Sequence, residues 1–310
     1  MLTNKSKVVI LGTTGMLGSI ILDLFTKNDD FDLIATYRNE TDAEKLKDTY
    51  GVVDFRVLDV ENTSVENIKE VVADAKWVVN AIGVIKPYIH DDNVEESERA
   101  IRINSLFPYN LGKATSETDA KVLQIATDCV YSGNKGQYIE SDAHDALDVY
   151  GKTKSLGETY LDNMLHLRCS IVGPELKAHL SLLDWFLSQD NNAEVNGYTN
   201  HQWNGITTLH FARIIRGIIK EDININHIQH IVPGNLISKA NLLKNFAKEF
   251  GRDDITINSV EAPKIIDRTL ATTNNKLNCE IWKAAGYSTP PTIEQMIAEL
   301  ADYDFAKKII

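Results

Sequence analysis

Tyr150 and Lys154 are the first residues whose types and spacing indicate chemistry. They stand four positions apart, so a helix would carry both on one face. A free phenol has a pKa near 10, and an ammonium about 4 Å away at an effective permittivity of about 20 stabilises the phenolate by about 4 kcal/mol, or about three pKa units. Such a phenol can exchange a proton near neutral pH. The pair alone is a weak signal, because tyrosine and lysine meet at this spacing on many helices.

Thr127 adds a third polar group to this pair. It directly follows the apolar run 122–126, which predicts a buried strand, and open α/β sheets bind their ligands beyond the carboxyl ends of such strands. A threonine hydroxyl there can donate to a substrate carbonyl. Thr127, Tyr150 and Lys154 together therefore predict proton transfer to a carbonyl oxygen.

A glycine loop near the start of the chain predicts a nucleotide site. The apolar run 8–11 leads into Gly12, Gly15 and Gly18 at three-residue spacing, and an amphipathic stretch follows. In a strand–turn–helix context, the first glycine permits a tight turn, the second lets a pyrophosphate approach, and the third lets helix and strand pack closely. We expect the helix N-terminus to face the pyrophosphate of a dinucleotide.

The residues after the second and third predicted strands bear on which dinucleotide binds. An NAD enzyme commonly carries a carboxylate at the end of the second strand, but the sequence there is Ala35-Thr36-Tyr37-Arg38. Arg38 can pair with a 2′-phosphate and stack on adenine, which favours NADP(H), with NAD(H) as the second choice. Asp59 is expected either to meet the adenine amino group or simply to end a strand.

The elements that would position these residues follow an alternating pattern. Short apolar runs and amphipathic stretches succeed one another through the first half, as in βαβ units. The predicted strands are 8–11, 33–36, 55–58, 77–81, 122–126, 166–172 and 227–232. The predicted helices are 17–26, 41–50, 65–73, 95–113, 150–163, 181–188, 209–220, 238–250 and 292–300.

This pattern predicts an α/β fold with two domains. We expect a Rossmann-type, doubly wound parallel sheet formed by residues 1–170 and 206–234. We expect a smaller, mixed α/β substrate-binding domain formed by residues 171–205 and 235–310, where the strict alternation fades.

Composition excludes several partners. The formal net charge of −12 disfavours a broad basic face for nucleic acid or an anionic membrane. Three widely separated cysteines favour a reducing compartment and no zinc site, and His227 and His230 would point to opposite faces of a strand. The chain shows neither a signal peptide nor an apolar stretch long enough to span a bilayer. We therefore expect a cytoplasmic protein without a metal.

With these motifs in place, the chain resembles an extended short-chain dehydrogenase/reductase, and within that group the dTDP-4-dehydrorhamnose reductase family. The resemblance covers nearly the whole chain. It is carried by the Gly12 loop, residues 80–83, Asn104, and the segments 126–133, 150–158 and 167–173, with a looser likeness at 202–208.

The resemblance implies roles for particular residues. Tyr150 would give the proton to a ketone oxygen, Lys154 would bind the nicotinamide ribose and lower the pKa of Tyr150, Thr127 would orient the carbonyl, and Asn104 would lie near the active-site water and proton path. The implied cofactor-binding set is Gly12, Thr14, Gly15, Met16, Leu17, Gly18, Arg38, Asp59, Val60, Ala81, Ile82, Gly83, Tyr150 and Lys154. The implied substrate contacts are Asp128, Cys129, Trp203 and Arg168, with Lys86 as an alternative cation to Arg168.

Departures from the family pattern narrow the expected reaction. Related dehydratases have an acidic residue after the aspartate, whereas here Cys129 follows Asp128. Ile171 and Thr207 replace a family tryptophan and proline, which leaves the sugar open. The expectation is NADPH-dependent reduction of the 4-keto group of a nucleotide-linked 6-deoxy sugar, for cell-surface polysaccharide synthesis, by an enzyme that is usually a homodimer in this group. The alternatives are a nucleotide-sugar epimerase and a non-catalytic NADP-binding regulatory subunit.

Overall fold

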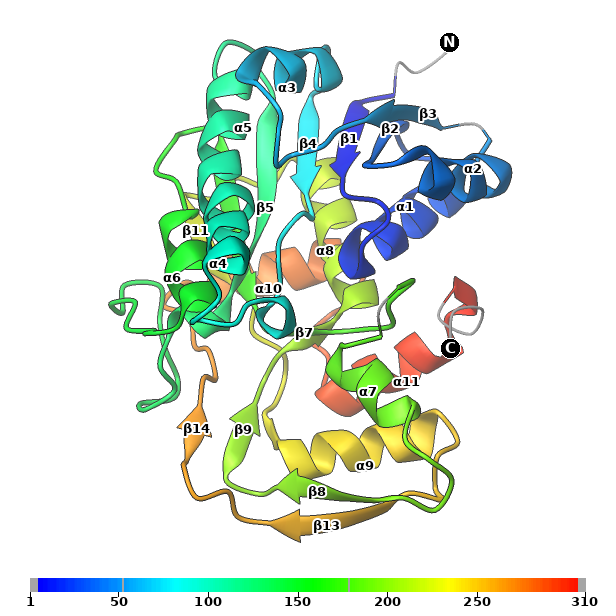
Figure 1. The fold of residues 1–310 in the computed structure, drawn as a ribbon. Helices are drawn as coiled ribbons and strands as arrows, with labels where there is room; N and C mark the ends of the chain where they lie inside the picture. Colours follow the sequence, from blue (N-terminus) through cyan, green and yellow to red (C-terminus); the bar gives the residue numbers. More distant parts are fainter. Residues whose placement is uncertain (1–4, 52, 178, 306–310) are drawn as a thin grey trace. The chain divides into compact units, whose positions relative to one another are not determined.

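The computed structural model describes residues 5–51, 53–177 and 179–305 (Figure 1). These residues form two compact units. Unit 1 comprises Met1–Ala126, Leu147–Leu167 and Asn224–Ile228, and unit 2 comprises Thr127–Ala146, Arg168–Ile223 and Gln229–Ile310. Unit 1 begins at residue 1 and unit 2 ends at residue 310, but residues 1–4 and 306–310 lie outside the described part of the chain.

A seven-stranded sheet is the largest sheet in the described residues. Its order is β11-β6-β5-β4-β1-β2-β3. The strands are β1 (Lys7–Leu11), β2 (Asp32–Tyr37), β3 (Asp54–Val57), β4 (Trp77–Asn80), β5 (Lys121–Thr127), β6 (Met164–Cys169) and β11 (Ile228–His230). The pairs β1–β2, β2–β3, β1–β4 and β4–β5 are parallel. This order, which runs outward from β1 in both directions, confirms the predicted doubly wound Rossmann-type fold.

Helices cover both faces of this sheet. Val9 and Leu11 of β1 belong to one buried cluster with Ile68 of α3 and Phe107 and Leu111 of α5. Side chains alternate along a strand, so the intervening residues of β1 point to the opposite face, where α1 packs on β1 and β2. The unit 1 helices are α1 (Met16–Asn28), α2 (Glu40–Thr49), α3 (Val65–Val71), η1 (Lys86–Tyr88), α4 (Val94–Ala100), η2 (Ile101–Leu106), α5 (Phe107–Thr115) and α6 (Val149–Leu156).

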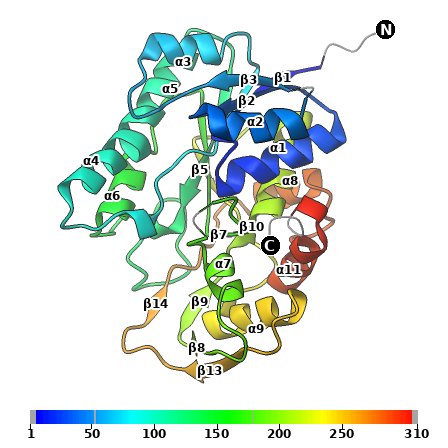
Figure 2. The ribbon, with the colours of Figure 1, turned by 45° about the vertical axis from the view of Figure 1, so that its right-hand side comes forward.

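The helix predicted over 95–113 is interrupted by a π-turn. The chain runs from α4 through the π-helical η2 into α5, with helical backbone angles at each junction. Pro108 lies in the first turn of α5, where its missing N–H costs least. Figures 1 and 2 both show α4 beside α6, and the two helices are in contact. The π-turn thus lies where this long helix meets α6.

The helix predicted over 150–163 ends earlier than expected, at Leu156. The residue after this end is Gly157, where an added Cβ would be 1.9 Å from the Asn104 carbonyl oxygen. This close approach of two backbones requires glycine, and the chain then continues irregularly into β6.

Unit 2 is built from shorter strands and from helices that pack on one another. Its helices are η3 (Asp128–Val130), α7 (Leu182–Leu187), α8 (Thr208–Glu221), α9 (Lys239–Glu249), α10 (Asn275–Ala284) and α11 (Ile293–Asp302). Its strands outside the large sheet are β7 (Ile171–Val172), β8 (Glu194–Tyr198), β9 (His201–Trp203), β10 (Ile206–Thr207), β12 (Ile237–Ser238), β13 (Thr256–Val260) and β14 (Ile266–Asp267). The sequence prediction did not include α10 or these short strands, apart from β7, which lies within the strand predicted over 166–172.

The two units divide the chain differently from the predicted domains in two long segments and two short ones. Residues 127–146 and 206–223, together with the shorter stretches 168–170 and 229–234, belong to unit 2, although the sequence pattern placed them in the dinucleotide-binding domain. The second segment holds α8, whose apolar side packs against α10 of the same unit. As a result the two units are of nearly equal length, so the second is not the smaller domain that we expected.

None of the helices in the described residues is both long enough and apolar enough to cross a membrane.

Gly18→Ala should destabilise unit 1. An added Cβ would lie 2.1 Å from the Gly12 carbonyl oxygen, so α1 would have to move away from the loop. Overpacking of this kind costs about 1–3 kcal/mol, and we expect a melting temperature several degrees lower by circular dichroism. Gly51→Ala is the control, because its Cβ would meet only the Lys47 carbonyl oxygen at 3.6 Å. Equal melting temperatures for the two variants would contradict the proposed contact.

Candidate functional site

The glycine loop joins β1 to α1 with an open helix N-terminus. Gly12 has φ +82°, and an added Cβ there would lie 2.7 Å from Cγ1 of Ile82. Gly15 is the N-cap of α1 and provides no side-chain acceptor for the first turn. By contrast, side chains of Ser64, Asn93 and Asp148 cap α3, α4 and α6. The first-turn N–H groups of α1 are therefore available to an anion.

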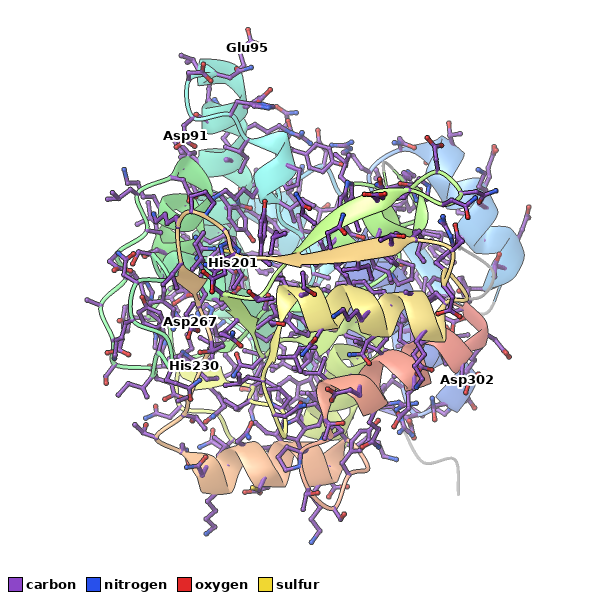
Figure 3. All side chains as sticks on the ribbon, turned by 90° about the horizontal axis from the view of Figure 1, so that it is seen from below. Asp91, Glu95, His201, His230, Asp267 and Asp302 are labelled. Carbon is purple, nitrogen blue, oxygen red and sulfur yellow. The ribbon has the colours of Figure 1, made fainter. Side chains whose placement is uncertain are left out.

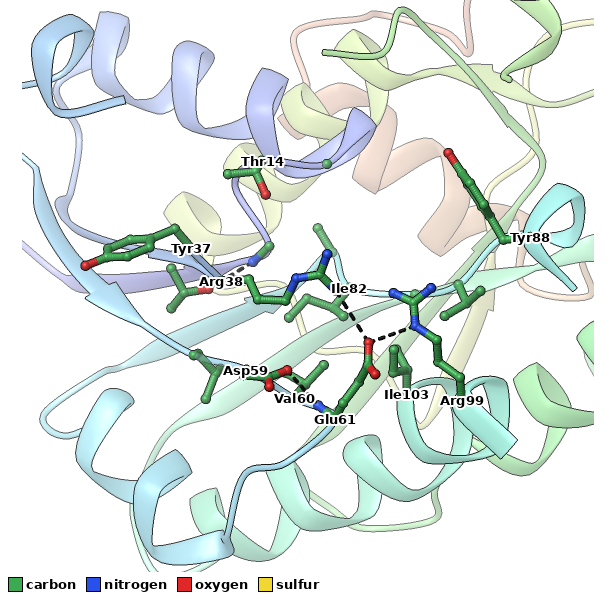
Figure 4. A pocket seen from close by; sticks show the side chains of 17 residues that line it. Thr14, Tyr37, Arg38, Asp59, Val60, Glu61, Ile82, Tyr88, Arg99 and Ile103 are labelled. Atoms are coloured by element: carbon green, nitrogen blue, oxygen red, sulfur yellow. Dashed lines mark hydrogen bonds and ion pairs between the residues drawn. The ribbon is translucent and has the colours of Figure 1, made fainter. Parts of the chain in front are cut away.

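A cavity of about 380 Å³ lies beside this loop (Figure 4). It is bounded by the residues that follow β1, β2, β3 and β4, at the carboxyl ends of adjacent parallel strands. Its lining residues are Gly12, Thr14, Gly15, Thr36, Tyr37, Arg38, Leu58, Asp59, Val60, Glu61, Ala81, Ile82, Gly83, Val84, Tyr88, Arg99 and Ile103. The loop, the open helix end and the cavity fit a dinucleotide.

Most of the predicted cofactor-binding residues line this cavity. Those that do are Gly12, Thr14, Gly15, Arg38, Asp59, Val60, Ala81, Ile82 and Gly83, whereas Met16, Leu17 and Gly18 form the start of α1 and are not among its lining residues. Tyr37, Glu61, Tyr88 and Arg99 line it as well and were not predicted. Tyr37 ends β2, Glu61 lies in an irregular segment, and Tyr88 and Arg99 lie in the helices η1 and α4. No spacing rule marks these four positions.

Arg38 reaches into the cavity and meets a carboxylate there. Its Nη1 lies 3.4 Å from Oε1 of Glu61, and Nε of Arg99 lies 2.7 Å from the same oxygen. Asp59 is held by its neighbours, accepting from the backbone N–H of Glu61 at 3.2 Å and from the side chain of Asn62 at 2.8 Å. The cavity therefore offers two guanidinium groups and two carboxylates on this side.

Asn104 is buried and holds the loop after β4. Its Oδ1 accepts from the Val84 N–H at 2.9 Å, and its Nδ2 donates to the Val84 carbonyl at 3.0 Å and to Oγ1 of Thr153 at 3.3 Å. Ser105 adds a hydrogen bond from its hydroxyl to the Thr153 carbonyl at 2.8 Å. These contacts give Asn104 a positioning role between the cavity loop and α6.

Lys154 and Tyr150 lie one turn apart on α6, as predicted. Lys154 is buried, and its Nζ donates to the Ile125 carbonyl at 3.1 Å. A Cβ added at Gly83 would lie 3.9 Å from this Nζ, so Lys154 reaches the edge of the cavity. Burial lowers the pKa of Lys154 to about 8, and the nearby carboxylate of Glu158 partly opposes that shift. Tyr150 packs against the cluster that contains Val84 and Ile103, which both line the cavity. Tyr150 and Lys154 themselves are not among the lining residues.

Thr127, Asp128 and Cys129 begin unit 2. The Thr127 hydroxyl donates to Oδ1 of Asp128 at 3.3 Å and accepts from the Cys129 N–H at 3.1 Å, so it also caps the short helix η3. Burial raises the pKa of Asp128, although Arg268 and Lys239 oppose that shift. Lys239 begins α9, and sequence reasoning did not single it out. Burial lowers its pKa to about 8, against the effect of Asp128.

The side chain of Arg168 is buried and bound by other residues of unit 2. Its side chain is 1% exposed, and Nη1 donates to the Tyr131 hydroxyl at 2.6 Å. The guanidinium also lies 2.8 Å from Nε2 of His230, which is labelled in Figure 3, and 2.8 Å from Nε2 of His144. Burial, reinforced by Arg168, lowers the pKa of His230 to about 4, so this ring is neutral and accepts. The predicted contact of Arg168 with substrate is not supported by this buried position.

The alternative cation, Lys86, is half-exposed and pairs with Asp148 at 2.9 Å.

Trp203 is a core residue. Its indole is 4% exposed and donates from Nε1 to Oγ of Ser170 at 2.8 Å. Gly205 packs against its six-membered ring, since an added Cβ would be 2.4 Å from Cζ2, and Nζ of Lys239 lies 5.4 Å from the ring centroid. Trp203 thus packs in the core, and the substrate contact that the resemblance implies for it stays a prediction.

Within the described residues, no group of three or more histidine, cysteine, aspartate or glutamate side chains is arranged to hold a metal ion.

Comparison with known proteins agrees with the fold. The model of the RmlD substrate binding domain family matches residues 6–304. A dTDP-4-dehydrorhamnose reductase of Mycolicibacterium smegmatis is 27% identical over 155 residues, which are 49% of this chain and 40% of that protein. The matched part thus spans less than half of this curated relative.

Two solved structures share the fold over nearly their whole length. One is a dTDP-4-dehydrorhamnose reductase from Bacillus anthracis in complex with NADP, with TM-score 0.72, 17% identity, and 96% of this chain and 98% of that chain covered. The other is a UDP-glucuronic acid 4-epimerase variant from Bacillus cereus in complex with a fluorinated UDP-sugar and NAD, with TM-score 0.74, 16% identity, and 98% and 100% covered. At these identities the likeness concerns the fold. The family match over nearly the whole chain confirms the resemblance inferred from the motifs: the chain belongs to the RmlD substrate binding domain family.

Proposed function

We propose that this protein is an NADPH-dependent reductase of the 4-keto group of a nucleotide-linked 6-deoxy sugar, serving cell-surface polysaccharide synthesis. The observation that carries the proposal is the position of Lys154 beside Gly83 at the edge of the cavity, with Tyr150 one helical turn before it on α6. A dinucleotide cavity with a lysine–tyrosine helix at its edge suits carbonyl reduction. The named reductase activity of the matched relative supports the same reaction.

Bound NADPH would supply the hydride to the carbonyl carbon. Lys154 is held in place by the Ile125 carbonyl, so its remaining N–H donors are free to bind ribose hydroxyls. Its positive charge also favours the phenolate form of Tyr150, which eases transfer of the phenolic proton to the carbonyl oxygen as negative charge develops there. Thr127 would donate a second hydrogen bond to that oxygen.

Arg38 supports NADP(H) as the preferred cofactor. It is the first residue after β2 and lines the cavity, where a guanidinium can bind a 2′-phosphate through two parallel hydrogen bonds. Of the two similar structures, the reductase is in complex with NADP and the epimerase with NAD. We propose NADP(H) first and NAD(H) second.

Asp128 and Cys129 support reduction over dehydration. They are the two residues after Thr127, but only Asp128 has a carboxylic acid side chain, and burial raises its pKa. Elimination of water would need an acid and a base at this position. We propose both residues as substrate contacts in a simple reduction.

A homodimer and a cytoplasmic location belong to the same proposal. Ile101, Leu106 and Tyr109 are exposed apolar or aromatic residues along η2 and α5, a surface suited to a second copy.

The thiols bear on the location of the protein. Cys169 is buried and Cys129 is partly buried, and both are free thiols, as expected in a reducing compartment.

Tyr150→Phe should abolish most of the reduction while leaving the cofactor bound. Loss of a general acid typically costs a factor of about 10²–10⁴. The measurement is NADPH oxidation with a panel of 4-keto nucleotide sugars, together with NADPH binding by fluorescence. Tyr160→Phe is the control, because Tyr160 is 84% exposed, and this variant should keep wild-type turnover. Wild-type turnover in Tyr150→Phe would refute the mechanism, and sugar interconversion without net NADPH consumption by the unaltered protein would identify an epimerase instead.

The affinity for NADPH should fall as the pH rises through the pKa of Lys154, which is about 8 in the free protein. The ammonium form predominates below this value and the weaker, neutral donor above it, so the dissociation constant should rise severalfold between about pH 7 and about pH 9.5. Glu158→Gln removes a carboxylate that raises this pKa, and should shift the midpoint to lower pH. Lys154→Met should bind weakly with no such transition. A wild-type profile that is flat over this range would contradict the assignment.

Arg38→Ala should weaken binding of NADPH more than binding of NADH. Hydrogen bonds to charged groups contribute about 1.5–3 kcal/mol, so we expect the dissociation constant for NADPH to rise about 10- to 100-fold. Arg102→Ala is the control, because its guanidinium pairs with Glu98 outside the lining of the cavity. Equal losses for the two dinucleotides in Arg38→Ala would refute a 2′-phosphate contact.

A further inference from the structure

Glu61 joins the two arginines of the cavity. Figure 4 shows Arg38 and Arg99 approaching its carboxylate from opposite sides. Both ion pairs end on Oε1, at 3.4 Å from Nη1 of Arg38 and 2.7 Å from Nε of Arg99. Arg38 follows β2 and Arg99 lies near the end of α4, so Glu61 connects two walls of the cavity.

This carboxylate can be exchanged for another anion at little cost. The side chains of Arg38, Glu61 and Arg99 are 56%, 29% and 41% exposed, and ion pairs exposed to water are weak. The backbone of Glu61 is fixed separately by its N–H, which donates to Asp59. The side chain of Glu61 can thus leave the arginines while the loop stays in place.

A 2′-phosphate and the Glu61 carboxylate would seek the same partners. Guanidinium groups bind phosphate and carboxylate in the same bidentate way, and a carboxylate next to a phosphate repels it. While Glu61 occupies Arg38 and Arg99, a phosphate has to displace it.

A 2′-hydroxyl would instead find an acceptor in Glu61. The end of β2 has no carboxylate, since the residues there are Thr36, Tyr37 and Arg38. Glu61 brings a carboxylate into the same cavity from the segment after β3. It thereby supplies the ribose acceptor that NAD enzymes usually carry on β2.

We propose that Glu61 sets the choice between NADP(H) and NAD(H): its carboxylate competes with a 2′-phosphate for Arg38 and Arg99, and accepts a hydrogen bond from a 2′-hydroxyl. The inference rests on the proposed dinucleotide binding and goes beyond it, because Arg38 alone would make the site selective for NADP(H). With Glu61 present, the protein binds both dinucleotides, and its preference for NADP(H) is smaller than the arginines alone would give.

The test is a set of binding titrations with Glu61→Gln, which keeps the shape of the side chain and removes its charge. The probes are 2′,5′-ADP and 5′-AMP, followed by NADPH and NADH, at constant ionic strength by calorimetry. We expect the variant to bind 2′,5′-ADP and NADPH about fivefold more tightly, the effect of one charge at about 4 Å in a solvated site. Binding of 5′-AMP and NADH should be unchanged or weaker.

Glu98→Gln is the matched control. Glu98 forms an ion pair with Arg102 at 2.7 Å, also at the surface, but neither residue lines the cavity of Arg38. This variant should keep the wild-type ratio of the two affinities. If Glu61→Gln also keeps the wild-type ratio while the wild-type protein binds both dinucleotides, the specificity role of Glu61 is refuted and the proposed function stands. If the wild-type protein binds neither dinucleotide, both are refuted.

Discussion

The buried amide of Asn104 is the contact on which the geometry of unit 1 depends. One side chain accepts from the Val84 N–H, donates to the Val84 carbonyl and donates to Thr153. It therefore fixes the loop after β4 to α6, and with it the distance between the cavity and Lys154. The π-turn η2 presents Asn104 in this position, and a buried amide that lost these partners would cost about 1–3 kcal/mol. Gly157 serves the same junction, because only a residue without Cβ lets α6 end against the Asn104 carbonyl.

Local patterns predicted the nucleotide half of the molecule well. The strands of the large sheet are short apolar runs, and the glycine spacing marks the β1–α1 turn, since both depend on neighbours in sequence. The π-turn and the early end of α6 were missed, and they meet where Asn104 and Gly157, 53 residues apart in sequence, lie in close contact. Glu61 and Arg99 were missed because their ion pair forms only when the segment after β3 and helix α4 fold together.

The second unit was predicted less well. Most of its strands have two to five residues, too few to show a period, and several pair with distant segments, as β8 does with β13. Arg168 and Trp203 illustrate a further difficulty. Both are residue types that often bind nucleotides, yet one has its guanidinium bound by Tyr131 and two histidines and the other packs against Gly205. Burial of such residues follows from tertiary packing, which the sequence pattern does not reveal. Lys239 lies beside Trp203 and near Asp128, two residues for which the sequence analysis predicted substrate contacts.

The net negative charge of the chain does not favour anion binding at the cavity beside the glycine loop. A net charge of −12 does not attract phosphates from a distance, so their capture depends on the helix end and on two arginines whose charges Glu61 partly neutralises. At the N-terminus of α1, stability of the helix competes with binding of an anion. A serine or aspartate at position 15 would cap α1 and stabilise it by a few tenths of a kcal/mol relative to glycine, but its oxygen would fill the place where an anion meets the first-turn N–H groups. Glycine at position 15 therefore makes the protein slightly less stable without a ligand, and it leaves the first-turn N–H groups of α1 open to bind an anion.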